Sequence, residues 1–415
     1  MKRRDFMKML AAGSAMSGLG LHSQAAPTAP RSNGNKLLVI FQRGGNDGLN
    51  TVIPIEASQY ALYQSLRPNI HIPMADILPT SHNHFGLHPQ LAPLQPIHAA
   101  GHLSFIHCVG YPNPDRSHFE SMAFLETAVP GNTLLQGWLN RYFQNTTGPG
   151  VIRGVCVGST SPQSMMGDIP IPTSTNFGTM QVGDDTLQGN DLPPGDLQNI
   201  LEQIHDLTST SNNELLYDTG GAIFQMVESF SNRNLDEYVP DNNAEYPDTT
   251  LGRNVMHAAQ MLKDTPTVLD IEVATIDMNG HDTHAQQVNK HEDLLADLAS
   301  SMAAFYTDMG SLMSQTLVLV ITEFGRRAYE NDSAGTDHGT GGVAMVMNHN
   351  VNGDVLMGGA WPGLEEENLY LGDDLNWVSD FRDIYWEIMA THLGVSSTAL
   401  QNIIPEHSYS PLGIF

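Results

Sequence analysis

Carboxylates and histidines gather in three segments, each of which follows an apolar run of strand length. The first segment contains Asp47, the second runs from Asp277 to His284, and the third begins at Glu323 and continues through residues 336–342. An isolated Asp-Gly pair usually marks only a turn, and an isolated loop histidine is usually just hydrogen-bonded. Because three such segments share a position after a strand, together they favour a functional site.

The residue types indicate metal chemistry. Imidazole and carboxylate together suit Zn, Mn or Fe, whereas all-oxygen sites suit Mg or Ca. These segments contain no cysteine, which excludes a thiolate zinc site. Two short patterns in the second segment could chelate a metal, Asp277 with His281 or Asp282 with His284. One pair would bind the metal and the other would orient it, and the sequence leaves the choice open.

Basic residues are scarce, yet several fall in the same strand-end segments, namely Arg43, Arg116, Arg326 and Arg327. Arginines near carboxylates can simply neutralise them through salt bridges. They can also bind phosphate, sulfate or carboxylate in a bidentate fashion. Both interpretations stay open.

The elements that must position these residues are strands and helices in alternation. Near-continuous apolar runs predict strands at residues 36–42, 103–109, 151–157, 267–276, 316–322 and 342–347. Helices are expected at residues 117–128, 285–309 and 381–393. This alternation predicts a doubly wound α/β fold, with a mostly parallel sheet flanked by helices. Ligands bind beyond the carboxyl ends of the strands in such sheets, where the three segments lie.

The first 26 residues read as an export signal. A basic start precedes an apolar stretch and small residues near Ala25, and Arg3-Arg4 with Phe6 fits the twin-arginine type. We therefore expect a periplasmic or secreted protein. Residues 27–35 form a linker, and residues 36–160 with 265–415 form the α/β core. Residues 161–264 are expected to be an insertion that caps the site, with helices near 194–208, 213–232 and 249–263.

Composition excludes several protein classes. The chain has 415 residues and is 40% hydrophobic, which is sufficient for a large core. Its 18 basic and 45 acidic residues give a net charge of −27, which disfavours nucleic acid as a partner. No internal apolar run reaches the ~18 residues of a membrane span. Cys108 and Cys156 are too few for a disulfide scaffold, and they could be either paired or buried as thiols. The oligomeric state is left open.

Several longer motifs resemble a known family. They are LVIFQRGGNDGLNTVIP (38–54), FGLHPQLAPL (85–94), VGYPNPDRSHFESM (109–122), Asp282-Thr283-His284, TEFGRRAYEND (322–332) and TDHGTGGVAMV (336–346). These runs are similar to the twin-arginine-exported bacterial family called domain of unknown function fifteen-oh-one. That family looks related to the alkaline phosphatase and sulfatase superfamily. The resemblance covers about residues 36–395 and implies an alkaline-phosphatase-like fold.

The resemblance also implies roles for particular residues. Asp47 matches the first metal-binding aspartate of the superfamily, and His338 matches its last histidine. Asp277 and His281 have the spacing of its Asp-x-x-x-His pair, although Asp282-Thr283-His284 is the part typical of the smaller family. Where the superfamily has an Asp-His pair, this chain has Glu323 followed by phenylalanine. The loss of that histidine argues against a second metal ion.

The nucleophile departs further from the superfamily pattern. The residue four places before His118 is Pro114, which cannot attack an ester. Ser117 is a nearby alternative, but it could instead cap the following helix in a capping box with Glu120. A water molecule activated by a divalent metal could replace the missing hydroxyl.

The sequence therefore predicts an exported metal-dependent hydrolase of phosphate or sulfate esters that acts on a small anionic substrate. One or two Zn, Mn or Fe ions would bind among Asp47, Asp277, His281, Asp282, His284, Glu323, Asp337 and His338. Arg43, Arg116 or Arg326 would hold the anion, and Ser117 or water would attack it. The alternative is a non-catalytic or degenerate relative that binds metal and serves as a cell-envelope binding or assembly factor. Pro114 and Phe324 favour that alternative.

Overall fold

The computed structural model describes residues 33–131, 134–148, 152–179, 228–230, 233–263 and 269–415. The predicted export signal and the helix predicted near 194–208 lie outside these ranges. So does the helix predicted near 213–232, apart from residues 228–230. None of the helices in these ranges is long and apolar enough to cross a membrane.

A nine-stranded sheet forms the centre of the molecule, in the order β11-β5-β10-β9-β1-β8-β6-β7 with β12 beside β5. β1 lies between β8 and β9 and is parallel to both, whereas β10 is antiparallel to β9 and β5. The predicted mostly parallel sheet is confirmed. The strands are β1 (Lys36–Gln42), β5 (Leu103–Gly110), β6 (Ile152–Val157), β7 (Thr173–Ser174), β8 (Leu269–Met278), β9 (Thr316–Thr322), β10 (Gly342–Met347), β11 (Val355–Leu356) and β12 (Ser379–Asp380).

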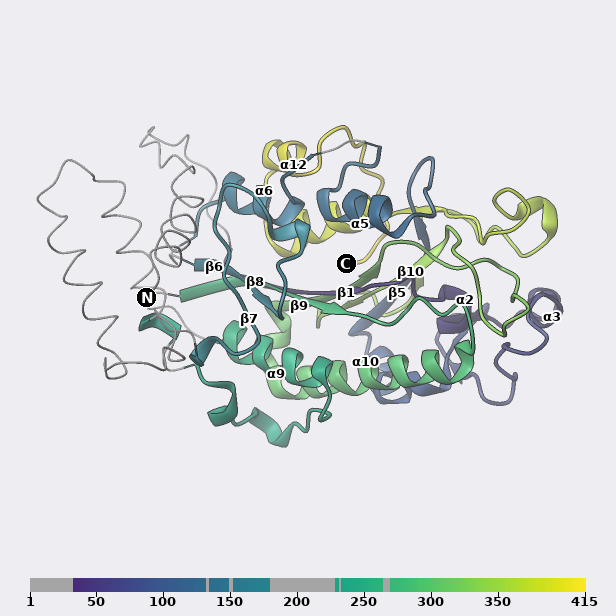
Figure 1. Cartoon of the computed structure of the whole chain (residues 1–415), viewed down its shortest axis with the longest axis horizontal. Helices are drawn as coiled ribbons and strands as arrows, with labels where there is room; N and C mark the ends of the chain where they lie inside the picture. The colour runs from purple at the N-terminus through teal and green to yellow at the C-terminus, as the bar shows by residue number, and fades with distance from the viewer. Residues whose placement is uncertain (1–32, 132–133, 149–151, 180–227, 231–232, 264–268) are drawn as a thin grey trace, which may run out of the picture.

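Helices cover both faces of this sheet (Figure 1). One face carries α9 (Thr250–Lys263), α10 (Gln287–Met309) and the short helix η1 (Pro89–Leu94). The other carries α5 (His118–Thr127), α6 (Trp138–Asn145), α11 (Phe381–Glu387) and α12 (Ser397–Ile403). Alternate residues of β1 enter the two hydrophobic cores, Leu38 on the first face and Val39 on the second. A strand buried on both faces needs the continuous apolar run seen in the sequence.

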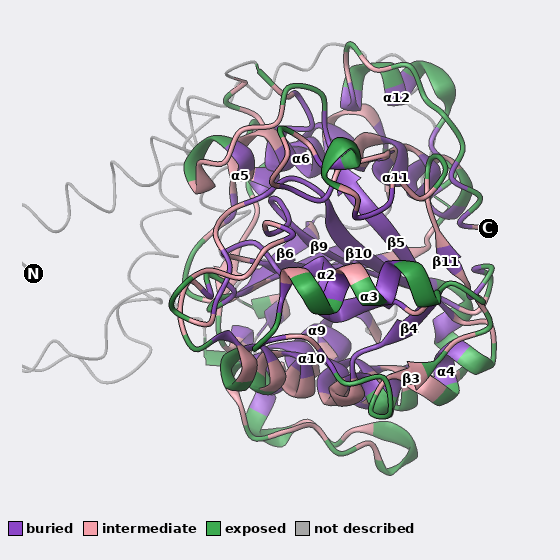
Figure 2. Ribbon diagram, turned by 90° about the vertical axis from the view of Figure 1, so that its right-hand side faces the viewer, coloured by how far each residue is buried: buried purple, intermediate pink, exposed green. Residues whose placement is uncertain are grey.

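A smaller unit follows β1 at the carboxyl edge of the sheet. It consists of α2 (Gly48–Thr51), α3 (Ala57–Leu66), α4 (Gln95–Ala99) and a three-stranded sheet of β2 (Val52–Pro54), β3 (Leu78–Pro79) and β4 (Phe85–Leu87). In Figure 2, α3 lies across the front of the central sheet, and the strands behind it are buried. This unit brings α3 close to the strand-end loops.

Three strands end together at this edge. In the sheet register, Gln42 of β1 pairs with both Met278 of β8 and Thr322 of β9. The loops that follow therefore start side by side, although more than 230 residues separate the first from the second. Cys108 and Cys156 are both buried and free, so the buried-thiol alternative holds.

Candidate metal centre

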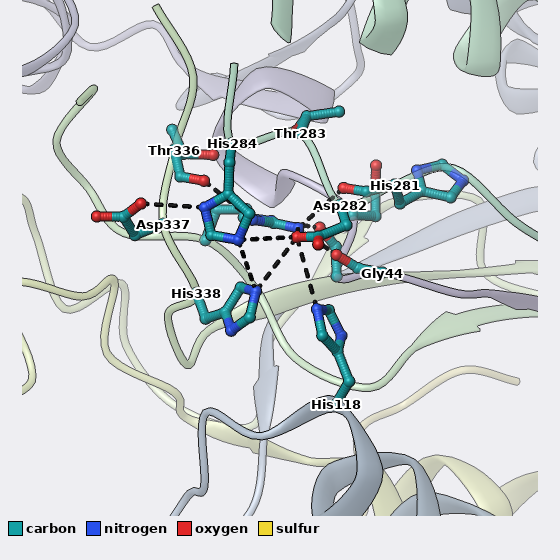
Figure 3. Close-up of polar contacts among 12 residues, drawn as sticks. Gly44, His118, His281, Asp282, Thr283, His284, Thr336, Asp337 and His338 are labelled. Carbon is teal, nitrogen blue, oxygen red and sulfur yellow. Dashed lines mark hydrogen bonds and ion pairs between the residues drawn. The ribbon is translucent and has the colours of Figure 1, made fainter. Parts of the chain in front are cut away.

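Three histidine rings converge on one carboxylate at this edge (Figure 3). The Oδ1 atom of Asp282 lies 3.0 Å from Nε2 of His284, 3.2 Å from Nε2 of His338 and 3.5 Å from Nε2 of His118. The Nε2 atoms of His284 and His338 are 2.9 Å apart. Among the described residues, His118, Asp282 and His338 form a group whose possible ligand atoms all lie within 4.8 Å of one another.

The other nitrogen of each ring is held by a hydrogen-bond acceptor. Nδ1 of His118 lies 2.8 Å from Oε1 of Glu323, and Nδ1 of His284 lies 3.1 Å from Oδ1 of Asp337. Nδ1 of His338 lies 2.8 Å from the carbonyl oxygen of Arg116. Because an ionised carboxylate or a carbonyl can only accept, each Nδ1 carries the proton. In the neutral form of each ring, Nε2 then presents a lone pair to the centre.

This convergence fits a cation better than it fits hydrogen bonding. Nε2 of His118 is buried and has no hydrogen-bond partner within the described part of the chain. When all three rings are neutral, their Nε2 lone pairs and the carboxylate oxygen repel one another unless a cation or a proton lies between them. In a tetrahedral site with bonds of about 2.0–2.1 Å, ligand atoms are about 3.3 Å apart, close to the 3.0, 3.2 and 3.5 Å between Oδ1 of Asp282 and the three Nε2 atoms.

Asp282 is fixed by Arg326. Nη2 of Arg326 donates to Oδ1 of Asp282 over 2.7 Å. Burial works in the opposite direction, but this hydrogen bond and its charge lower the pKa of Asp282 to about 2. Asp282 is therefore ionised at any pH at which the protein would function, as a metal ligand must be.

Arg326 itself is buried, and each of its side-chain nitrogens donates a hydrogen bond. Nε donates to the carbonyl of Gly45, Nη1 to that of Thr336, and Nη2 to those of Gly44 and His281. The guanidinium thus ties the three strand-end loops together. The structure places Arg326 as the support of Asp282, away from a position where it could grip a substrate anion.

Glu323 and Asp337 support the rings from behind. Besides His118, Glu323 accepts hydrogen bonds from the backbone amide of Gly44 and from the hydroxyl of Thr322, at 2.8 and 3.1 Å. Its hydrogen bond raises the pKa of His118, which makes the ring a better donor of electrons. Both carboxylates were predicted as metal ligands, and the structure places them against the far nitrogens.

The two ligand pairs left open by the sequence lie in different surroundings. Asp282 belongs to the group of possible ligands, and His284 lies beside that group, with 3.0 Å between its Nε2 and Oδ1 of Asp282. Asp277 instead pairs with Arg43, with 2.7 Å between Oδ1 and Nη2. His281 is buried beside Gln42, and burial lowers the pKa of its ring to about 3. Among the described residues, neither Asp277 nor His281 joins the metal-ligating group.

A cleft of about 500 Å³ opens beside the centre. His118, Asp282 and Glu323 form part of its wall, and Arg43 lines it as well. Arg43 contacts Glu126 as well as Asp277, so two carboxylates already neutralise its charge. The remaining lining mixes polar and apolar residues: Gly44, Met122, Glu126, Thr160, Ser161, Pro162, Gln163, Asp277 and Asn279.

The other predicted residues lie outside this lining. Arg116 pairs with Asp374, with 2.8 Å between Nη2 and Oδ2. Ser117 occupies the N-cap position of α5, but its hydroxyl makes no capping hydrogen bond within the described chain. The capping box interpretation is therefore wrong. The nearby carboxylate is Asp115, which accepts from the backbone amide of Ser117 over 2.6 Å.

Asp47 lies in the protein interior, where it pairs with Arg67. Two residues important for this part of the molecule were absent from the sequence prediction, His118 and Arg67. His118 could have been found, because it follows β5 in the same way as the other site residues follow their strands. Arg67 gives no such signal, since it terminates a helix far from any of the three segments.

Comparison with known proteins adds a family match. The model of the family "Protein of unknown function (DUF1501)" matches residues 196–365, and this confirms the predicted resemblance over that part of the chain. No curated protein matches the sequence.

Solved structures show only a general similarity. Alkaline phosphatase from the Antarctic bacterium TAB5 is 10% identical, with 86% of this chain and 98% of that chain covered and a TM-score of 0.32. A lipoteichoic acid synthase from Listeria monocytogenes is 8% identical, covering 93% and 78%, with a TM-score of 0.29. Phosphonate monoester hydrolase of Agrobacterium radiobacter is 7% identical, covering 87% and 74%, with a TM-score of 0.30. Scores this low assign no activity.

Proposed function

We propose that His118, Asp282, His284 and His338 bind a divalent Zn, Mn or Fe ion, and that the protein is a metal-dependent hydrolase of phosphate or sulfate esters. The observation that supports this most is the orientation of the three rings, each with Nδ1 held and Nε2 directed at Asp282. A bound divalent ion would act as a Lewis acid towards an ester oxygen and would acidify a water molecule.

The residues around this centre would each have a separate role. Glu323 and Asp337 keep two of the rings in place, and Arg326 keeps Asp282 in place. The cleft gives an ester access to the side of the centre formed by His118 and Asp282. Because Ser117 does not line this cleft, water is the better-placed nucleophile.

The same geometry supports a second candidate, a metal-binding protein of the cell envelope without catalysis. Arg43, Arg116 and Arg326 are all paired with carboxylates, so none offers an unneutralised charge to a substrate anion. Phe324 fills the position of the superfamily's histidine, and its ring centroid lies 4.9 Å from those of His118 and His338.

Metal analysis of the purified mature protein tests the centre. We expect bound Zn, Mn or Fe in the wild type and in His84→Ala, an exposed histidine away from the centre, and loss of the metal in His338→Ala. A metal-free wild type whose stability is unchanged by chelator would contradict the proposal. Hydrolysis of phosphate or sulfate esters that disappears in His338→Ala supports the enzyme. Bound metal without hydrolysis supports the second candidate.

We also propose export through the twin-arginine pathway to the periplasm or beyond. The support is the amino-terminal segment with Arg3 and Arg4 followed by Phe6. Cell fractionation of an Arg3→Lys/Arg4→Lys variant checks this, since retention of the variant inside the cell is expected. Unchanged export would contradict it.

A further inference from the structure

The most deeply buried ion pair near the centre joins Asp47 and Arg67. Oδ2 of Asp47 lies 2.7 Å from Nη1 of Arg67, and both side chains are at most 1% exposed. The same nitrogen donates to Oδ1 of Asn50 over 2.7 Å. Burial opposes ionisation, but Arg67 lowers the pKa of Asp47 below its usual range. Asp47 is therefore a permanent anion with a cation of the chain beside it.

The position of Arg67 is fixed from several sides. Nε donates to the carbonyl of Ala328 over 2.9 Å, and Nη2 donates to that of Arg327 over 2.8 Å. The guanidinium also lies over the ring of Tyr63, with 5.9 Å between the guanidinium carbon and the ring centroid. Arg67 therefore cannot move away from Asp47 without breaking these hydrogen bonds between the end of α3 and the loop after β9.

Gln287 links this ion pair to the metal centre. Its side-chain nitrogen donates to Oδ2 of Asp47, the oxygen that also contacts Arg67. Its side-chain oxygen accepts from the hydroxyls of Thr283 and Thr336, at 3.0 and 2.6 Å. Thr283 lies between the ligands Asp282 and His284, and Thr336 lies two residues before His338. One amide thus joins Asp47 to two of the three segments that carry the proposed metal ligands.

A second metal ion at Asp47 does not fit these contacts. Oδ2 faces two donor groups, and a cation placed there would meet the charge of Arg67. Oδ1 is buried without a partner among the described residues, as is Nδ1 of the buried ring of His281. Asp47 nevertheless belongs to no group of three ligating atoms in the described part of the chain. Zinc sites in proteins have three or four protein ligands.

We infer that the guanidinium of Arg67 takes the place of a metal ion beside Asp47. The protein therefore binds one metal ion. Asp47 affects that ion only as a positioning residue, through Gln287. This inference rests on the metal centre proposed above. It departs from the role that the resemblance implies for Asp47, which is that of a metal ligand.

Stoichiometry tests the inference. Calorimetric titration of the metal-free mature protein with Zn²⁺ should give one equivalent in the wild type, one in Asp47→Asn and none in Asp282→Ala. Two equivalents in the wild type, one of them lost in Asp47→Asn, would overturn the inference and leave the proposed centre standing. No binding by the wild type would overturn both. The wild-type value decides the matter even if Asp47→Asn fails to fold.

The positioning role has its own test. Gln287→Met should keep one equivalent but weaken Zn²⁺ binding about 10–100-fold, the usual effect of removing support from metal ligands. Gln59→Met is a matched control, because the Gln59 amide also donates to a carboxylate, on Glu365, and accepts two hydrogen bonds, from Trp361 and Leu364. It is expected to bind Zn²⁺ as the wild type does. Equal affinity in Gln287→Met and Gln59→Met would contradict the role of Gln287.

Discussion

At the scale of single residues, the two nitrogens of each histidine in the centre have different roles. Nδ1 is held by Glu323, Asp337 or a backbone carbonyl, and this sets both the tautomer and the direction of Nε2. The acceptors are as decisive for the centre as the ligands, although none of them would contact a metal.

Glu323→Gln tests this division of duties. An amide is a weaker acceptor for Nδ1 of His118 and can also flip to present a donor, so we expect metal affinity to fall about 10–100-fold. Metal titration of the purified variant measures the change. Glu330→Gln is the control, because Glu330 accepts from the backbone amides of Asn69 and Ile70 and, within the described part of the chain, forms no hydrogen bond with a proposed ligand. Similar affinities in the two variants would contradict the role of Glu323.

The sequence identified Asp282, His284 and His338 as candidates because each follows a strand in a loop rich in ligand-type residues. It could not separate the proposed ligands from the carboxylates that hold them, since carboxylates suit both roles and only the folded structure shows which nitrogen they face. The sequence also could not predict the partner of Asp47. Arg67 meets Asp47 through tertiary packing, for which a single sequence gives no pattern.

At the scale of elements, the site depends on how closely the strand-end loops approach one another. Gly44 has a φ of +114°, and a Cβ atom there would lie 2.4 Å from the backbone nitrogen of Asp282. Only glycine permits this approach. The loop after β1 thus forms the backbone wall against which the Asp282 loop is set.

Gly44→Ala should therefore separate the two loops. We expect a loss of stability of at least about 2 kcal/mol from strain and overpacking, and metal binding weakened more than about tenfold. Gly101→Ala is the control, because Gly101 also has a positive φ, +79°, but open space where a Cβ would lie. It should lose only about 1 kcal/mol. Chemical denaturation and metal titration measure both effects, and equal losses in the two variants would contradict the argument.

Arg43 joins elements on the cleft side, since it bridges the end of β1 to Glu126 of α5 and Asp277 of β8. Removing it leaves two carboxylates without their cation, one of them buried, so Arg43→Ala should destabilise the fold by about 3 kcal/mol. Arg253→Ala, which breaks an exposed pair with Asp236, should cost less than about 1 kcal/mol. Denaturant unfolding compares the two, and a small effect at Arg43 would refute its bridging role.

Most elements of the core were predictable, because continuous apolar runs and helical spacing follow directly from burial on two faces. The direction of β10 was not, since an apolar run reads the same for a parallel and an antiparallel strand. The capping of α5 was also missed. Ser117 has the expected residue type and spacing, but the side chain that bonds at this turn belongs to Asp115.

At the scale of the whole molecule, several histidines are buried as neutral rings away from the centre. Burial lowers the pKa of His107 to about 4 and that of His257 to about 4, from an ordinary value of 6.5. The unfolded chain binds these protons below pH 6.5, whereas the folded chain does not until about pH 4. Acidification across this window therefore favours unfolding.

We expect the free energy of unfolding to fall by up to about 1.4 kcal/mol per pH unit for each such histidine as the pH drops from 6.5 towards 4. His257→Gln should reduce this slope by about one proton, since glutamine does not titrate. Its Nε2 accepts from the amide of Phe177 over 2.9 Å, a contact that the glutamine oxygen can reproduce. Denaturation series at several pH values measure the slope, and an identical slope in the variant would rule out His257 as a source.

The separation of the ligands along the chain has a kinetic consequence. His118 precedes His338 by more than half of the chain, and the loops that carry the ligands meet only after β1 has inserted between β8 and β9. Contacts of such long range form late, because their loop-closure entropy is compensated only when the sheet is complete. A nascent or partly folded chain would thus have no chelating centre, and capture of a metal ion would mark the moment at which folding ends.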